Sequence, residues 1–180
     1  MKPFPPLKTK HFLLGVFFLC CIDAVKAQNN VSLPPVVKAG LEMDRSVLID
    51  KIAAYDSTMI FKQEGDVNGE PNFIGQDKNG NELQLIGTQD MLRIAKWTFA
   101  FSPGKELLNK NLDKMAYFVF TLGEHAGDDW FKGFVKELMS TPFEPLTANQ
   151  GFNFNRKAKV EYNVKIKLFT VTFVELGASF

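Results

Sequence analysis

The alternation of hydrophobic and polar positions is clearest in the last third of the chain. From Ala158 to Leu168 every even-numbered position is apolar and every odd-numbered position is polar. A period of two predicts a β-strand with one buried and one solvated face, as in an antiparallel sheet. From Phe169 onward the apolar positions become odd-numbered. Either one long strand therefore bends at a bulge, or a three-residue turn at residues 163–165 makes a hairpin.

Further strands are indicated in the middle of the chain. Two short apolar-rich runs at residues 72–76 and 82–87 flank the dipeptide Asn79-Gly80, the strongest short-range signal for a β-hairpin. Residues 91–101 alternate in two phases, and the change of phase at Ala95-Lys96 predicts a bulge within one strand.

The clearest helical pattern runs from Asp128 to Met139. Trp130, Phe134 and Leu138 recur at a spacing of four residues, while lysines and a glutamate occupy the opposite side. Such an amphipathic stripe predicts a helix that packs on a sheet. Asp128 is expected to be its N-cap, because a side-chain oxygen there can accept a free backbone N–H.

Two other segments have helical character. Residues 46–57 begin with a serine suited to an N-cap and predict a short helix. The apolar run from Met115 to Gly123 has the length of a strand and is interpreted as a central strand, although its periodicity also fits a buried helix. The fold predicted from these elements is α+β: a curved antiparallel sheet of about five to seven strands, one amphipathic helix packed on one face, and a short N-terminal helix.

The N-terminus has the pattern of a secretory signal peptide. Three lysines in the first ten residues precede an apolar run from Phe12 to Ile22, and small residues follow at Val25 and Ala27. The run is well short of the ~20 residues that span a bilayer. We therefore expect cleavage after Ala27, an exported protein that is periplasmic or extracellular, and no integral membrane span after cleavage. The remainder is divided into a flexible N-terminal arm, residues 28–45, and a single α+β domain, residues 46–180.

Cleavage would also change the composition. Both cysteines, Cys20 and Cys21, would be lost with the signal peptide, so the exported protein would be free of disulfides. It would retain 17 Lys and Arg against 19 Asp and Glu, a net charge of −2. So weak a charge does not favour nucleic acid as a partner, and no phosphate-binding or dinucleotide motif indicates a cofactor.

Aromatic residues are abundant in the part that would remain, which has fourteen phenylalanines. A curved sheet wrapped on a helix can enclose an apolar pocket lined by such rings. The residues expected to bind a ligand there come from the predicted helix, the apolar run and the C-terminal strands: Phe118, Trp130, Phe134, Phe152, Phe154 and Tyr162.

A second candidate site lies in the sequence GEHAGDD. Glu124, His125, Asp128 and Asp129 offer three carboxylates and an imidazole within six residues, which resembles a metal or acid/base site. The spacing matches no metal motif, and a double aspartate also suits the start of a helix. Asp77, Asn79 and Asn81 resemble a calcium loop, but the glycine and the glutamate that such a loop needs are replaced by Glu82 and Thr88, so a turn is the better interpretation.

The chemistry that the sequence excludes shapes the functional prediction. After residue 27 the chain has a single histidine and no G-x-S-x-G motif, so a Ser-His-Asp enzyme is not expected. We predict a non-enzymatic binding module for a small apolar ligand, a glycan or an envelope protein. The alternative is a small exported hydrolase or metal-dependent enzyme centred on Glu124, His125, Asp128 and Asp129.

Overall fold

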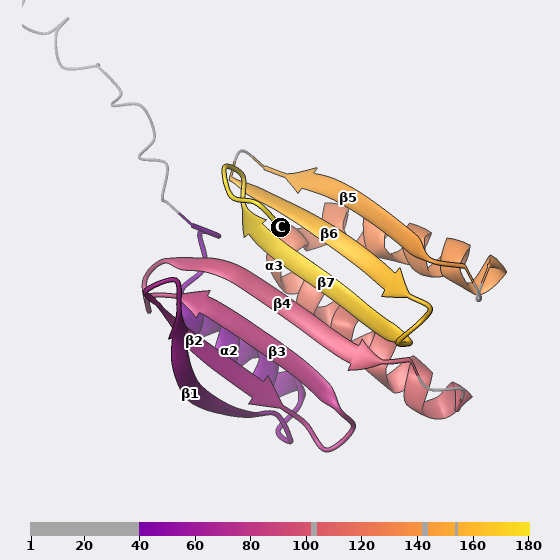
Figure 1. Ribbon diagram of the computed structural model, residues 1–180, viewed down its shortest axis with the longest axis horizontal. Coiled ribbons are helices and arrows are strands. Elements are labelled where there is room, and N and C mark those ends of the chain that lie inside the picture. The colour runs from indigo at the N-terminus through magenta and orange to yellow at the C-terminus, as the bar shows by residue number, and fades with distance from the viewer. Residues whose placement is uncertain (1–39, 102–103, 142–143, 154) are drawn as a thin grey trace, which may run out of the picture. The chain divides into compact units, whose positions relative to one another are not determined.

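A computed structural model describes residues 40–101, 104–141, 144–153 and 155–180 (Figure 1). The predicted signal peptide, residues 28–39 of the predicted arm, and Phe154 lie outside the described residues. The elements follow one another as α2 (Arg45–Tyr55), β1 (Ile60–Val67), β2 (Glu70–Gln76), β3 (Asn81–Gly87), β4 (Leu92–Ala100), α3 (Lys105–Ser140), β5 (Leu146–Phe152), β6 (Arg156–Asn163) and β7 (Leu168–Glu175).

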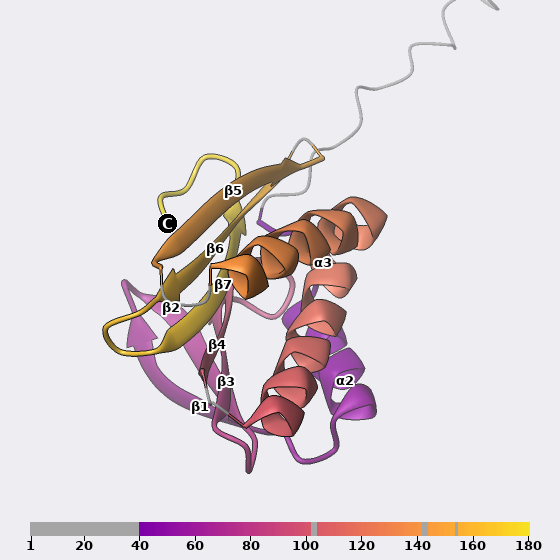
Figure 2. The same cartoon turned by 90° about the vertical axis from the view of Figure 1, so that its right-hand side faces the viewer.

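The strands form one seven-stranded antiparallel sheet in the order β1-β2-β3-β4-β7-β6-β5. Both helices lie behind the sheet in Figure 1, and the view turned by 90° shows them on the same side (Figure 2). The predicted α+β fold with an antiparallel sheet is confirmed. Within the described ranges, no helix has both the length and the apolar character that crossing a membrane requires.

The sheet register agrees with the predicted turns. The β2–β3 hairpin turns at Asp77–Gly80, where Gly80 has a φ of 78°, which glycine adopts without steric cost. Residues 156–175 form a hairpin rather than one bent strand, with Asn163 opposite Leu168 across a turn at 164–167. A bulge occurs in β4, but Arg93 is the extra residue, two positions before the predicted change of phase.

The run Met115–Gly123 lies in the middle of α3, so its interpretation as a strand was wrong and the buried-helix alternative is confirmed. The deciding signal is in the preceding segment. Buried residues recur there every three or four positions, among polar ones, and this spacing continues through the run: Leu108, Asn111, Leu112, Met115, Phe118, Val119 and Leu122. A nine-residue, mostly apolar run cannot by itself show which period it follows.

The long helix is kinked at Glu124, whose φ of 54° and ψ of −147° are not helical. The second helical segment starts there, so Asp128 lies inside a helix and is not its N-cap, contrary to the sequence-based prediction. Its carboxylate accepts a hydrogen bond from Lys132 at 2.6 Å, one turn further along. The amphipathic pattern of this segment is confirmed by the burial of Phe134 and Leu138.

A buried arginine of β6 supports the kink. The guanidinium of Arg156 donates a hydrogen bond to the carbonyl of Leu122, two residues before Glu124. The same side chain lies 3.8 Å from the carboxylate of Glu42 and is 7% exposed. A hydrogen-bond donor at this point satisfies a helix carbonyl that would otherwise be desolvated.

The described end of the predicted N-terminal arm is fixed on the domain. Leu41 is fully buried, and its N–H donates to the carbonyl of Leu92 at 2.7 Å. The N–H of Gly40 donates to the carboxylate of Glu175 at 3.0 Å. Residues 40–44 therefore pack at the end of the sheet before α2 begins, and Asp44 rather than Ser46 stands at its N-cap position.

Candidate functional site

The predicted aromatic ligand site forms part of the core between α3 and the sheet. Phe118 meets Phe173 edge-on with ring centroids 5.6 Å apart, and Trp130 meets Phe152 at the same distance. The remaining described rings continue this packing: Phe134 on Phe169 and Tyr162 on Phe169. Aromatic pairs at such distances stabilise a core beyond their area burial. Ligand binding by these residues stays a prediction, and Phe154 lies outside the described residues.

The predicted metal or acid/base residues lie at the kink of α3. Glu124, His125 and Asp129 are exposed, and the imidazole of His125 packs edge-on against the ring of Phe120. Asp128 is paired with Lys132. Across the described ranges, no three His, Cys, Asp or Glu side chains are grouped so that they could hold a metal ion.

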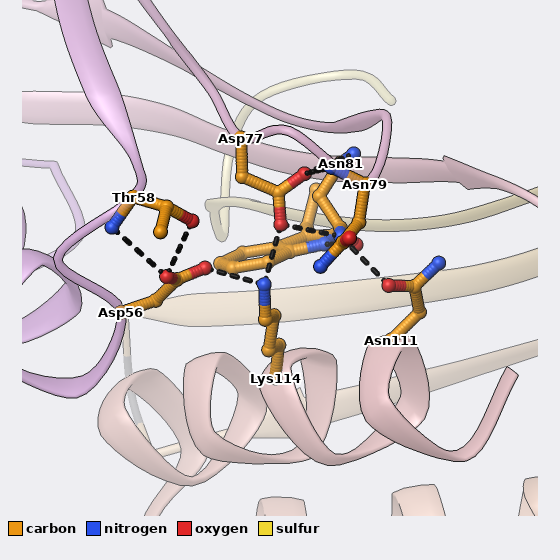
Figure 3. Close-up of polar contacts among 8 residues, drawn as sticks. Asp56, Thr58, Asp77, Asn79, Asn81, Asn111 and Lys114 are labelled. Carbon is orange, nitrogen blue, oxygen red and sulfur yellow. Dashed lines mark hydrogen bonds and ion pairs between the residues drawn. The ribbon is translucent and has the colours of Figure 1, made fainter. Parts of the chain in front are cut away.

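A buried ion-pair centre joins three segments that are distant in sequence (Figure 3). Lys114 of α3 places its Nζ 2.5 Å from a carboxylate oxygen of Asp56, at the end of α2, and 2.5 Å from one of Asp77, in the β2–β3 turn. The three side chains are 14%, 9% and 0% exposed. Thr58 donates to the other oxygen of Asp56 through its N–H at 3.0 Å and its hydroxyl at 2.7 Å.

The charges of this centre hold one another in the ionised state. Burial alone would lower the pKa of Lys114, but hydrogen bonds and charge from Asp56 and Asp77 raise it overall. Burial would likewise raise the pKa of Asp56, while hydrogen bonds from Lys114 and Thr58 and the lysine's charge lower it overall. A lysine that serves as nucleophile or base needs a lowered pKa. Lys114 therefore stays protonated at neutral pH, which suits a structural role.

The polar network continues from Asp77 into the core. Asp77 accepts hydrogen bonds from the N–H groups of Asn79 and Asn81, and the side chain of Asn81 donates to Asn111 at 2.8 Å and accepts from the indole of Trp97 at 3.1 Å. The turn that resembled a calcium loop thus folds around its own aspartate, and the cation beside that carboxylate is the ammonium group of Lys114. The sequence showed the turn but gave no indication of its partner on α3.

A hollow of about 620 Å³ opens beside this centre, at the start of α3. It is lined by charged residues of both signs: Lys78, Lys105, Lys110 and Lys114 with Asp56 and Glu106. Lys110 is already paired with Glu106 at 2.7 Å and Lys114 with its two aspartates. The geometry here ties the two helices to the β2–β3 turn.

The other face of the sheet carries no helix in the described chain (Figures 1 and 2). After β7 the chain turns back across this face, and a hollow of about 430 Å³ lies between this C-terminal segment and the β6–β7 turn. Its floor is made by the outward side chains of β3, β4, β7 and β6, and Ile166 and Phe180 are among its walls. We call this the outer hollow.

Rows of side chains cross the floor of the outer hollow because the strands are in register. Ile86, Ile94 and Val174 are neighbours on β3, β4 and β7 and make an apolar row. The next row, one side-chain step along the strands, places Thr172 between Lys96 and Lys159. The two lysines are thus two strands apart, which is about 10 Å across a sheet.

These two lysines differ in their partners. Lys159 lies 2.7 Å from the carboxylate of Glu161 on its own strand. Lys96 has no ion pair with any described carboxylate, although it is partly buried. The outer hollow therefore combines an apolar row with a positive charge that the described chain leaves unneutralised. These lysines carry no functional signal in the sequence, because an outward lysine on a strand is typical of solvated surface.

The fold and this surface define a two-layer α+β domain that leaves one sheet face open. Comparisons with family models, with curated proteins and with solved structures found no match for the chain. The functional assignment therefore rests on the geometry of the site.

Proposed function

We propose that this chain is an exported, non-enzymatic binding module whose ligand site is the outer hollow. The observation that carries the proposal is the hollowed face of the sheet, which has no helix in the described chain and on which Lys96 is partly buried and pairs with no described carboxylate. A volume of about 430 Å³ lies within the range of small-molecule sites, roughly 300–1,000 Å³. Export is supported by the signal-peptide pattern of residues 1–27.

The ligand class follows from the lining of the outer hollow. Ile94, Ile166 and Phe180 favour an apolar body, because each lines the hollow and exposes apolar surface whose removal from water contributes to binding. Lys96 beside the hydroxyl of Thr172 favours an anionic group at one end of that body, while the charge of Lys159 is offset by Glu161, which also lines the hollow. The ligand is therefore a small amphipathic anion, of which a medium-chain carboxylate is the simplest representative.

Nuclear magnetic resonance of the isotope-labelled protein tests this function with three probes that share one tail: decanoate, decanol and decyltrimethylammonium, all below their micellar concentrations. We expect decanoate to shift the methyl resonances of Ile94 and Ile166, which are the accessible isoleucines of the hollow, and to bind more tightly than the other two probes. Lys96→Gln should lower the affinity for decanoate by up to about fivefold, since a partly exposed ion pair contributes up to about 1 kcal/mol.

The matched control is Lys62→Gln, which removes a lysine from β1 outside the outer hollow. It should leave decanoate affinity unchanged. Equal binding of decanoate and decyltrimethylammonium would refute the anionic ligand, and absence of shifts at both Ile94 and Ile166 would refute the site. Export is tested separately by mass spectrometry of the protein released from a bacterial periplasm, which should begin at Gln28.

A further inference from the structure

The two edges of the sheet are protected to different degrees. On the β1 edge, charged side chains at Lys62, Glu64 and Asp66 accompany a shift of register between Glu64 and Val67. Charges and bulges are the devices by which proteins prevent an edge strand from pairing with another chain. The β5 edge, LTANQGF, has no charged residue and stays in regular register with β6 over its whole length. Only β1 is guarded against strand addition.

The hydrogen-bonding groups on the free side of β5 follow from the register. The N–H of Leu176 donates to the carbonyl of Asn155 in register with the β6–β7 ladder, so odd-numbered residues of β6 bond to β7. Even-numbered residues of β6 therefore bond to β5, and their partners in β5 are also even-numbered. Thr147, Asn149 and Gly151 consequently turn their N–H and C=O groups to the free edge. In agreement, the carbonyl of Gly151 accepts a hydrogen bond from the side chain of Gln150 at 3.2 Å.

A hollow for a side chain lies beside this edge. It has a volume of about 440 Å³ and is lined by Thr147 of β5, by Glu161, Tyr162 and Asn163 of β6, and by Pro145, Val164 and Lys165 next to the strands. Glu161 and Lys165 are charged, but most of the accessible wall is apolar, which suits an uncharged aliphatic side chain. An edge that supplies main-chain bonds and a pocket that supplies selectivity are the two components of strand addition.

We propose that β5 accepts an extended peptide segment of a partner protein as an eighth strand, with an aliphatic side chain of that segment seated in the hollow beside Thr147. A peptide fits better than a second copy of this chain. Two paired β5 edges would join seven residues on each side, whereas stable interfaces use about 20–30 residues a side. The hollow beside Thr147 shares Glu161 and Asn163 with the outer hollow, but no residue of β5 lines the outer hollow, so strand addition does not require a ligand there.

The test uses the full chain and the synthetic peptide acetyl-KTVTLTVK-amide, an alternating strand former with lysines at both ends for solubility. Titration should shift the backbone amide resonances of residues 146–152 and leave those of β1 unchanged. Two further peptides are N-methylated on alternate residues. One should bind as the parent does, and the other should bind at least tenfold more weakly, because only one set of N–H groups faces β5.

Asn149→Pro removes one N–H from the free side of β5. It should keep the melting temperature of the domain within a few degrees of the native value and weaken peptide binding at least tenfold. Gln150→Pro is its matched control, since it removes an N–H that bonds β6 and should destabilise the domain. Equal binding of both N-methylated peptides, or shifts on β1 equal to those on β5, would overturn strand addition. A dimer in sedimentation that Asn149→Pro converts to monomer would also overturn the proposal, because a second copy would then occupy the edge.

Discussion

Lys114→Met is the sharpest perturbation of the buried ion-pair centre. Methionine keeps most of the length and apolar stem of lysine but removes the cation that lies 2.5 Å from both Asp56 and Asp77. The two carboxylates would remain 9% and 0% exposed, with no positive charge between them. The substitution thus leaves uncompensated negative charge in a poorly solvated site, which destabilises the folded state.

The magnitude follows from that burial. Removing one partner of a buried ion pair costs about 3–5 kcal/mol, and for a domain of this size 1 kcal/mol lowers Tm by about 2–4 °C. Lys114→Met should therefore lower Tm by roughly 6–20 °C and shift the urea midpoint, which the fluorescence of buried Trp97 reports. The control is Lys110→Met, one turn earlier in α3, whose side chain is 60% exposed and pairs with Glu106. It should cost under about 0.5 kcal/mol, and equal losses for the two variants would refute the reasoning.

The same centre sets a pH dependence. The pKa of Asp56 is lowered from its ordinary 3.8, so its contribution to stability is complete above that value and is lost as pH falls below it. The pKa of Lys114 is raised from its ordinary 10.5, so its contribution is complete below that value and is lost as pH rises above it. The difference in unfolding free energy between the native chain and Lys114→Met should be constant from about pH 6 to 9 and shrink toward both extremes. A difference that instead changes steadily across neutral pH would contradict this assignment.

Three smaller changes test other parts of the domain. Glu124→Gly should stabilise the domain by up to about 1 kcal/mol, because glycine adopts a positive φ without steric cost. Glu124→Ala should give no stabilisation. Urea denaturation of both variants therefore separates relief of backbone strain from loss of the glutamate side chain. Arg156→Met should cost about 1–3 kcal/mol in the same assay, because the carbonyl of Leu122 loses its buried donor. Asn111→Leu should cost about 1–2 kcal/mol, because Asn81 loses a buried acceptor; a shifted Trp97 fluorescence maximum would check the network.

Strands β3, β4 and β6 could be predicted from sequence because each has a face whose burial decides its side-chain order. The edge strands give a weaker pattern, since β1 has no buried residue and β5 has one. In β6, Ala158, Val160 and Tyr162 are buried while Lys159 and Glu161 are partly exposed, and a shift by one residue would invert this arrangement. The turn at Asn79-Gly80 added a local signal that needs no tertiary context. Pattern and turn together specify a hairpin.

Helix α3 shows where such patterns become ambiguous. Its central run is buried against the sheet, but Phe120 stays 42% exposed, so apolar character there does not report burial. The kink at Glu124 then interrupts the helical phase before the amphipathic segment resumes. Glu124 gives no local signal for a positive φ, which glycine or asparagine would have given.

The ion-pair centre lay beyond prediction for a different reason. Asp56, Asp77 and Lys114 belong to three elements, and only the tertiary fold brings them within hydrogen-bonding distance. Each taken alone is an ordinary charged residue at the end of a helix, in a turn or on a helix surface. Local sequence can identify the turn that begins at Asp77. The contact of Asp77 with Lys114 joins two segments that are distant in sequence, so it depends on the topology of the whole fold.

The one-sided arrangement of helices separates the residues that stabilise the domain from those available for binding. Inward side chains of β4 and β7, such as Trp97 and Phe173, are buried beneath the helix layer, so substituting them should lower stability and affect ligands only through unfolding. Lys96 and Thr172 alternate with them on the same strands but face the outer hollow. Because successive residues of a strand point to opposite faces, one position along β4 converts a stability variant into a binding variant. Alternating substitutions from Ile94 onward should therefore divide by parity. Unfolding free energy should change at the buried Ala95 and Trp97, and decanoate affinity at the outward Ile94 and Lys96.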